Sequence, residues 1–399
     1  MAVIDADAPA NAKASTTAST QEILAALVGF DTTSRNSNLP LIEWVEAYLA
    51  RYGVESERVY DATGEKANLW ATIGPADAAG IVLSGHTDVV PVDGQDWSTD
   101  PFTLTERDGK LYGRGSADMK GFLAACLAKV PAMVEAPLEK PIHLAFSYDE
   151  EVGCQGVLTL VAALKEKPLH YEACIVGEPT SMGVVTAHKT TRRYRADFTG
   201  LACHSSLAPQ GVSAVSYAAR LVAYIDETAA RLAAGAQDGL YDLPHSTANV
   251  GIFTGGNALN IVPASASVDF EYRMLPQVDL QPEHDALTEF VAGLNDEMAA
   301  RDPSCGVTLE MIISVPGLDT PPDAPVVTFA KRLAGRNDHA KVAFGTEAGS
   351  FAGDLGIPTV VLGPGAIAQA HKADEFIAIS QLASCERVLD QIIDHCCKG

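Results

Sequence analysis

Imidazole and carboxylate side chains occur at five places where an apolar run of the sequence ends or a helical pattern begins. These side chains are His86 and Asp88 in "IVLSGHTDVVP", Asp118 in "GRGSADMKG", Glu150 and Glu151 in "SYDEEVG", Glu178 in "IVGEPT", and His371 in "GPGAIAQAHKADEF". Three carboxylates and two imidazoles supply two terminal ligands to each of two metal ions and one ligand that bridges them. Mixed nitrogen and oxygen ligation suits Zn²⁺, for which Co²⁺ or Mn²⁺ can substitute. These residue types therefore predict a site for two Zn²⁺ ions in each chain.

The run Asp149-Glu150-Glu151 favours the same prediction. Three adjacent carboxylates repel one another and resist burial unless a strong positive charge lies beside them. A pair of divalent ions would supply that charge. Asp88 follows His86 by two residues, so on an extended segment both side chains point the same way, and Asp88 is placed to fix the tautomer of the His86 imidazole.

Each of these residues has an ordinary structural explanation when it is taken alone. A single histidine after a strand is more often a hydrogen-bonded loop residue than a metal ligand. The segment "GRGSAD" leaves open a nicotinamide-dependent enzyme, but it reads G-x-G-x-x-D and lacks the third glycine of a dinucleotide-binding loop. The joint occurrence of the five segments is what favours the metal site.

The elements that must position these side chains alternate along the chain. Apolar residues recur at helical spacing between residues 21 and 53, where we expect two helices. Short apolar runs and helical stretches then follow in turn: "NLWATIG", "IVLSGH", "KGFLAACLAKVPAM", "IHLAFSYDEE", "VLTLVAAL" and "ACIVGEP". This alternation predicts an α/β sheet, and functional groups in open α/β sheets gather at the carboxyl ends of the strands.

The pattern changes near residue 188 and changes back after Pro316. Between these points the order is strand, helix, two strands, helix and strand, which is typical of a split βαβ module. We therefore predict a disordered N-terminal tail at residues 1–20, a catalytic domain in two parts at 21–187 and 315–399, and an inserted α+β domain at 188–314.

The composition excludes some classes of partner. The net charge of −23, from 28 basic and 51 acidic residues, argues against binding to nucleic acid or to an anionic membrane surface. No apolar run approaches the length of a transmembrane helix. The eight cysteines lack regular spacing, and the first residues lack the pattern of a signal peptide, so we expect a cytoplasmic protein with reduced thiols.

Several phrases of the sequence resemble those of one enzyme family: "FDTTSRNSN", "GRGSADMKGFLAA", "FSYDEEVGCQG", "VGEPT", "FGTEAGSF" and "GPGAIAQAHKADEF". The chain resembles the dinuclear-zinc amidohydrolases and exopeptidases, a family that includes acetylornithine deacetylase, succinyl-diaminopimelate desuccinylase, glutamate-releasing carboxypeptidases and aminoacylases. The resemblance runs from about residue 21 to the C-terminus. It implies a zinc-exopeptidase-like mixed sheet flanked by helices, with the inserted domain forming a ferredoxin-like lid that also holds a homodimer together.

The resemblance also implies how the predicted ligands share two zinc ions. Asp118 would bridge the ions. His86 and Glu178 would bind one ion, and Glu151 and His371 the other. The peptide bond that follows Asp118 would be cis.

Further roles follow from the same resemblance. Glu150 would not bind metal and would act as the general base beside the bridging water. His204, in "GLACHSSLAPQG", would stabilise the oxyanion in the site of a partner subunit, although a surface loop histidine is its simpler interpretation. Asn260 and Arg273 would hold the α-carboxylate of the substrate, a task that a bidentate guanidinium fits.

The expected reaction is the removal of acetate from N2-acetyl-L-ornithine to give L-ornithine, a step of arginine biosynthesis. The motifs that build the metal site do not separate one acyl group from another, so a sibling deacylase remains an alternative, such as a succinyl-diaminopimelate desuccinylase or a broader N-acyl-amino-acid amidohydrolase. A catalytically inactive binding protein would lack the base or a ligand, and all of these residues are present. In each hydrolase interpretation the partner is a small N-acyl amino acid.

Overall fold

The computed structural model describes residues 18–398, so most of the tail predicted at residues 1–20 lies outside the described part. The first element is helix α1 (Thr20–Val28). Its N-cap residue Ser19 accepts a hydrogen bond from the backbone of Glu22, whose carboxylate accepts one from the Ser19 backbone at 2.8 Å. This reciprocal pair is a capping box, which explains why the helix begins at this point of the sequence.

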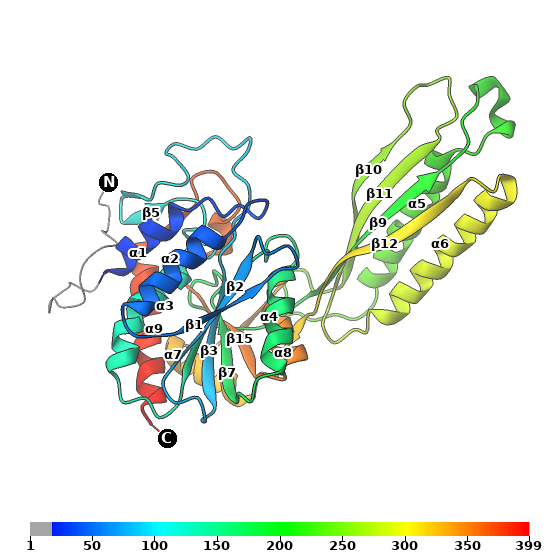
Figure 1. The fold of residues 1–399 in the computed structure, drawn as a ribbon. Coiled ribbons are helices and arrows are strands. Elements are labelled where there is room, and N and C mark those ends of the chain that lie inside the picture. The colour runs from blue at the N-terminus through cyan, green and yellow to red at the C-terminus, as the bar shows by residue number, and fades with distance from the viewer. Residues whose placement is uncertain (1–17, 399) are drawn as a thin grey trace.

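The larger part of the molecule is built around a nine-stranded mixed sheet (Figure 1). The strand order is β1-β2-β6-β3-β7-β15-β8-β13, and β14 pairs with β8. Strands β6, β3, β7 and β15 run parallel to one another, whereas β1 pairs with β2 in antiparallel orientation. The strands are β1 (Ser56–Tyr60), β2 (Ala67–Ile73), β3 (Gly80–His86), β6 (Ile142–Ser147), β7 (Tyr171–Val176), β8 (Val185–His188), β13 (Leu318–Asp319), β14 (Ala340–Val342) and β15 (Thr359–Val361).

Helices cover both faces of this sheet, so its central strands are buried on both sides. One face packs against α1 and against α2 (Leu39–Ala50), α3 (Lys120–Glu135), α7 (Pro325–Ala334) and α9 (Ile379–Cys396). The other face packs against α4 (Gln155–Lys165) and α8 (Ala348–Asp354). All seven residues of β3 are buried, as expected for an apolar run at the centre of a parallel sheet. The predicted α/β architecture is therefore confirmed.

Smaller elements lie at the rim of the large sheet. They are a three-stranded sheet of β4 (Thr105–Arg107), β5 (Lys110–Tyr112) and β16 (Phe376–Ala378), and the short 3₁₀ helix η2 (Ile367–Gln369). The small sheet pairs Phe376 with Tyr112, and so it joins the loop before α3 to the loop that follows β15.

The second part of the molecule, residues Thr190–Val315, projects away from the large sheet (Figure 1), and we call it the inserted module. Its antiparallel sheet has the order β10-β11-β9-β12, which with its connections is the ferredoxin-like arrangement. Its elements are β9 (Thr190–Thr199), η1 (Ser205–Gln210), α5 (Ala214–Ala233), β10 (Thr247–Gly255), β11 (Ser265–Met274), α6 (Gln281–Arg301) and β12 (Gly306–Val315). Helix α5 begins at Ala214 because the Ser213 side chain caps it, accepting from the backbone of Ser216.

The two helices of the inserted module cover only one face of its sheet. Along β9 and β11 buried residues alternate with exposed or half-buried ones, and the buried set packs against α5 and α6. The opposite face carries charged side chains of β9 and β11. This uncovered face matters for the site described below.

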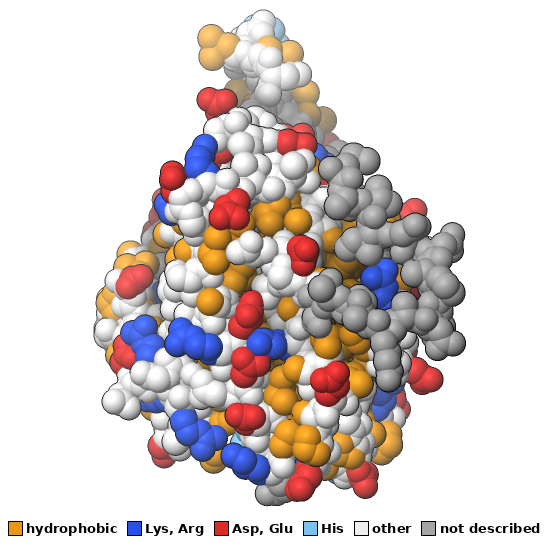
Figure 2. All heavy atoms as spheres, turned by 90° about the vertical axis from the view of Figure 1, so that its left-hand side faces the viewer, with side chains coloured by type: hydrophobic (Ala, Val, Ile, Leu, Met, Phe, Trp, Pro, Cys, Tyr) orange, Lys and Arg blue, Asp and Glu red, His pale blue; other side chains and the backbone are white. Residues whose placement is uncertain are grey.

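The surface of the larger part carries charges of both signs. Figure 2 shows the face that lies on the left of Figure 1, where acidic and basic side chains are interspersed with apolar ones and the visible basic groups do not form a continuous patch. Within residues 18–398, no helix has the length and apolarity that crossing a membrane requires.

Candidate active site

The structure brings the five predicted metal ligands together at the carboxyl edge of the large sheet. His86 ends β3, Glu151 follows β6, Glu178 follows β7, Asp118 precedes α3, and His371 lies in the loop after β15. His86 Nε2 lies 3.1 Å from Asp118 Oδ1 and 3.8 Å from Glu178 Oε1. His371 Nε2 lies 3.0 Å from Glu151 Oε2 and 3.3 Å from Asp118 Oδ2. Asp118 therefore stands between two histidine-carboxylate pairs, as a bridging ligand must.

Most of these groups are withdrawn from solvent. His86 is 0% exposed, Glu178 4% and Asp118 5%. Two groups, His86 with Glu150 and Glu178, and His86 with Asp118 and Glu151, have ligand atoms within 4.8 Å of one another. Oε1 of Glu178 is buried and has no hydrogen-bond partner among the described residues. A buried carboxylate oxygen without a donor carries a large desolvation cost, which a bound cation would offset.

The pKa values of the clustered carboxyl groups also favour a bound cation. Burial raises the pKa of Glu150 to about 8, and the neighbouring charges of Glu151 and Asp118 act in the same direction. Burial and the charge of Asp118 raise the pKa of Glu151 to about 7. Burial also raises the pKa of Asp118, but hydrogen bonds with His371 and His86 outweigh it and leave this pKa well below its usual range. The carboxylates are more numerous than the positive charges beside them, which is the environment that divalent cations occupy.

Asp88 supports both His86 and the segment after β6. His86 Nδ1 lies 2.9 Å from the Asp88 backbone oxygen and 3.5 Å from its carboxylate. If Nδ1 carries the proton, Nε2 is free to bind metal. The Asp88 carboxylate also accepts hydrogen bonds from the backbone N–H groups of Glu150 at 3.1 Å and Glu151 at 3.3 Å. It thereby holds the two glutamates in place, a role that sequence reasoning missed.

The acidic triplet after β6 is divided among three environments. Asp149 pairs with Lys66, whose Nζ lies 2.6 Å from one carboxylate oxygen and 2.7 Å from the other. Glu150 receives a contact from the Cys154 thiol at 3.3 Å, and Glu151 contacts His371. The ion pair with Lys66 therefore offsets the negative charge of Asp149. Glu150 and Glu151 remain beside other carboxylates of the cluster.

A buried ion pair positions the loop that carries Asp118. Arg114 and Glu375 are both 1% exposed, and Arg114 Nη1 lies 2.7 Å from Glu375 Oε2. The Glu375 carboxylate also accepts hydrogen bonds from three backbone N–H groups, those of Gly115 at 3.0 Å, Ala117 at 2.9 Å and Asp118 at 3.1 Å. Since Glu375 follows His371 by four residues, this one carboxylate connects the loops of two predicted ligands.

The Asp118–Met119 peptide bond is cis, which confirms the prediction made for it. Sequence reasoning had no comparable expectation for Arg114 or Glu375.

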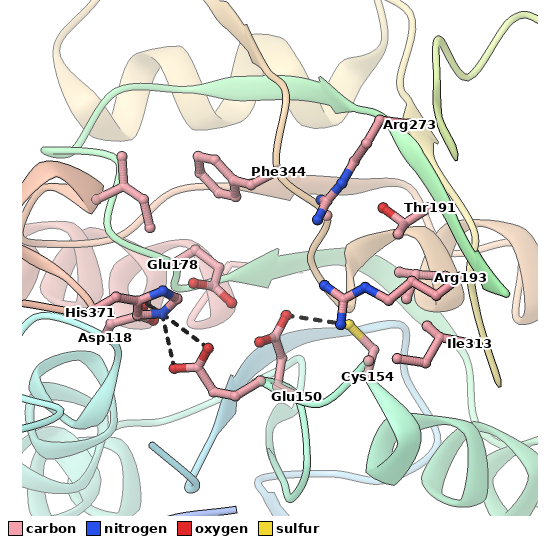
Figure 3. Close-up of a pocket in the computed structure, with 15 residues that line it drawn as sticks. Asp118, Glu150, Cys154, Glu178, Thr191, Arg193, Arg273, Ile313, Phe344 and His371 are labelled. Atoms are coloured by element: carbon pink, nitrogen blue, oxygen red, sulfur yellow. Dashed lines mark hydrogen bonds and ion pairs between the residues drawn. The ribbon is translucent and has the colours of Figure 1, made fainter. Parts of the chain in front are cut away.

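A pocket extends from the cluster to the uncovered sheet face of the inserted module (Figure 3). Arg273 lines it, and the family resemblance implies a substrate-binding role for this residue. Arg193 and Thr191 line it as well and were not predicted. The signal was present in "TTRRYRADFT", where Arg193 alternates with apolar residues, but alternation alone does not tell whether a face looks at solvent or at a pocket.

His204 and Asn260 do not reach this pocket within one chain. Both are exposed, and His204 caps η1, its Nδ1 accepting a hydrogen bond from the Ser206 backbone N–H at 3.2 Å. They lie close to each other, since the Ser205 backbone N–H donates to the Asn260 backbone carbonyl oxygen at 2.9 Å. Their predicted roles therefore depend on a second chain or on a movement of the module.

Comparison with known proteins identifies the family. The sequence profile described as peptidase family M20/M25/M40 matches residues 82–395, a range that contains every predicted metal ligand. The chain belongs to this family. Among curated relatives, the acetylornithine deacetylase of Myxococcus xanthus is 35% identical over 381 residues, covering 94% of this chain and 97% of the relative. The acetylornithine deacetylase of Photorhabdus laumondii is 34% identical over 369 residues, covering 92% and 93%.

Solved structures show the same M20 fold at lower identity. An M20 family metallo-carboxypeptidase from Sulfolobus solfataricus superposes with a TM-score of 0.76 at 18% identity, covering 95% of this chain and 99% of that one. A dinuclear metal binding peptidase of family M20 from Bacillus subtilis gives a TM-score of 0.63 at 12% identity, covering 94% and 97%. At these identities the likeness establishes the fold.

Proposed function

We propose that this M20 chain is a metal-dependent amide hydrolase that removes acetate from N2-acetyl-L-ornithine to give L-ornithine. The observation that carries the proposal is the placement of Asp118 between the pairs His86 with Glu178 and His371 with Glu151. The acyl group and the amino acid are taken from the acetylornithine deacetylases that are about a third identical over nearly the whole chain.

The residues present fit a pair of divalent cations. The unpartnered Glu178 oxygen and the excess of buried carboxylates support this fit, and the family contains a dinuclear metal binding peptidase. Two imidazoles and three carboxylates suit Zn²⁺, with Co²⁺ or Mn²⁺ as substitutes. When bound, two such ions would acidify a water molecule and polarise the acyl carbonyl.

The side chains of the pocket would carry the remaining chemistry. Glu150 takes a proton from the attacking water and hands it to the amide nitrogen as the carbon–nitrogen bond breaks, so that acetate and the free amine leave. Asp88 keeps His86 and the backbone of Glu150 in position. Arg273 binds the α-carboxylate of the substrate and fixes the scissile amide beside Glu150.

We further propose that the chain works as a homodimer in which residues 188–314 form the lid and the dimer contact. Edge strand β10 exposes two large apolar side chains, Ile252 at 57% and Phe253 at 46%. An open strand edge with exposed apolar residues favours pairing with another chain. In such a dimer His204 and Asn260 would complete the partner's site, His204 as the oxyanion donor.

The remaining expectations about partners and compartment stay predictions. The eight cysteines carry free thiols, which suits the reducing cytoplasm that we expect. The acidic net charge supports the expectation that neither nucleic acid nor an anionic membrane surface is a partner.

A panel of substrates tests the proposed reaction. The zinc-loaded enzyme is assayed with N2-acetyl-L-ornithine, N-succinyl-diaminopimelate, N-acetylmethionine and a glutamyl peptide, and kcat/KM is measured for each. We expect the highest value for N2-acetyl-L-ornithine. A clear preference for another member of the panel would overturn the substrate assignment, and no hydrolysis of any member would overturn the assignment as an amide hydrolase.

A further inference from the structure

Two arginines of the inserted module stand on neighbouring strands and on the same sheet face. Arg193 of β9 pairs in register with Glu271 of β11, and Arg273 lies two residues further along β11. The neighbouring residue Tyr194 is buried among the helices, so Arg193 points to the uncovered face. Residues at diagonal positions on adjacent strands are close enough for long side chains to act together.

Glu271 holds both arginines and leaves part of each guanidinium free. Its Oε2 lies 3.1 Å from Arg193 Nε and 3.2 Å from Arg273 Nη2, and its Oε1 lies 3.0 Å from Arg273 Nε. Burial alone would raise the pKa of Glu271, but the two arginines lower it, so the group stays ionised. Arg193 makes no other ion pair or hydrogen bond through its side chain among residues 18–398, so both of its Nη groups are available to a ligand. The three residues together carry one net positive charge.

The free edges of these arginines face the metal-ligand cluster. Arg193, Arg273 and Thr191 line the same pocket as Asp118 and Glu150, and Figure 3 shows both guanidinium groups directed toward the carboxylates. Thr191 is 3% exposed, and its Oγ1 has no hydrogen-bond partner among the described residues. A buried hydroxyl without a partner in a pocket wall is a group that a ligand can satisfy. The pocket thus has an acidic floor and a wall with two guanidinium groups and one free hydroxyl.

We propose that Arg193 is a further substrate-binding residue, which together with Arg273 and the Thr191 hydroxyl binds the α-carboxylate of an N-acyl amino acid. This inference rests on the proposed function and refines it. One guanidinium can bind a carboxylate through two parallel hydrogen bonds, and a second guanidinium reaches the remaining lone pairs of the same oxygens. Glu271 acts as a positioning residue, because it fixes the orientation of both arginines without facing the substrate.

The substrate class follows from this arrangement. The enzyme should require a free α-carboxylate on the amino-acid portion and should discriminate strongly against the corresponding carboxamide. A neutral carboxamide leaves one guanidinium without an anionic partner and brings its own N–H donors toward the arginines. The carbonyl at the scissile bond is identical in the two substrates, so the discrimination isolates the contacts of the carboxylate.

The test compares N2-acetyl-L-ornithine with its α-carboxamide in the zinc-loaded enzyme. For Arg193→Gln we expect kcat/KM for the acid to fall by about 10- to 100-fold, the effect of removing a charged hydrogen-bonding partner, mainly through KM. The value for the carboxamide should change by less than about threefold, so that discrimination shrinks. Arg193→Lys keeps the charge without the planar fork and should give an intermediate loss.

Arg195→Gln is the matched control. Arg195 lies two residues along β9 on the same face and is 43% exposed in its side chain against 41% for Arg193, but it pairs with Asp197 and Asp269 and does not line the pocket. It should leave both substrates unaffected.

Three outcomes would overturn the inference. Equal losses on the acid and the carboxamide would make Arg193 a structural residue. An unchanged Arg193→Gln enzyme would remove it from the site. With N2-succinyl-L-ornithine assayed as a third substrate, a loss confined to that substrate would mean that Arg193 contacts the acyl group instead. If the wild-type enzyme hydrolyses no N-acyl amino acid, the proposed function fails instead. If Arg193→Gln does not fold, the Arg193→Lys comparison alone decides, because loss of discrimination is expected there too.

Discussion

The metal-ligand cluster and the substrate-binding face are held in different ways. Three of the proposed ligands, His86, Glu151 and Glu178, lie at or shortly after the ends of strands of one sheet, and Asp118 and His371 lie in loops at the same edge. Buried carboxylates such as Asp88 and Glu375 fix the backbone of this region. The proposed substrate-binding residues lie on a module that the chain enters between His188 and Thr190 and leaves between Val315 and Leu318. One region is assembled within a single chain, and the other still lacks His204 and Asn260 in its pocket. The difference indicates that metal binding and substrate recognition can be disrupted separately.

The largest difference between an effect on activity and an effect on metal binding is expected for a substitution of the proposed base, Glu150. Glu150→Gln keeps the shape of the side chain and removes its ability to take a proton, so kcat should fall by roughly two to four orders of magnitude. Zinc content, measured by elemental analysis, should stay near that of the wild type because Glu150 is not among the five proposed ligands. If zinc is lost together with activity, Glu150 is a ligand and Glu151 becomes the candidate base.

The second prediction concerns a substitution that changes only the inserted module. Ile252→Lys places a charge on the exposed edge strand β10 and should convert the proposed dimer into monomers, as measured by light scattering. Activity should fall by about 10²- to 10³-fold, because the monomer loses an oxyanion donor, while zinc content stays unchanged. Leu158→Lys, at an exposed apolar residue of α4, is the control and should change neither property. A monomeric Ile252→Lys enzyme with full activity would refute the need for a partner.

A smaller effect is expected from the residue that supports the metal site. Glu375→Gln weakens the acceptor of the Arg114 guanidinium and of three backbone N–H groups, and so loosens the loops of Asp118 and His371. Zinc affinity should fall by about 10- to 100-fold, measured by competition with a chelator. The adjacent control Asp374→Asn weakens only the acceptor of two Ser98 hydrogen bonds and should leave zinc affinity unchanged. Equal affinities of the two variants would contradict this role for Glu375.

Three residues of the proposed metal-ligand cluster, His86, Glu151 and Glu178, could be predicted from the sequence because they lie at or shortly after the ends of strands. Parallel strands bring their carboxyl ends to one edge of a sheet. The α/β pattern therefore predicts that His86 and Glu178, which are far apart in the sequence, lie close together. The split βαβ order of the inserted module was equally readable, since its strands alternate with two long amphipathic helices.

Other parts of the site depend on contacts that no local pattern records. Glu375 accepts from the backbone of Asp118 across 257 residues, and its neighbours in the sequence give no sign of this contact. Arg193 has the pattern of a solvated charge on a strand, and only the position of the whole module places it beside the cluster. The hydrogen bonds from backbone N–H groups to Asp88 could not be predicted, because every residue except proline carries such a group and the sequence does not mark which ones a carboxylate will contact.

The central claim is that each chain holds a complete metal site and that its partner completes the substrate site. Complementation tests it most directly: Glu150→Ala chains, which keep His204, are mixed with His204→Ala chains, which keep the base, under conditions where subunit exchange is verified. In the mixed dimer one site combines an intact Glu150 with a donated His204, so substantial activity should return although both parent enzymes are nearly inactive. If no activity returns after exchange, His204 does not act across the dimer, and the claim is wrong.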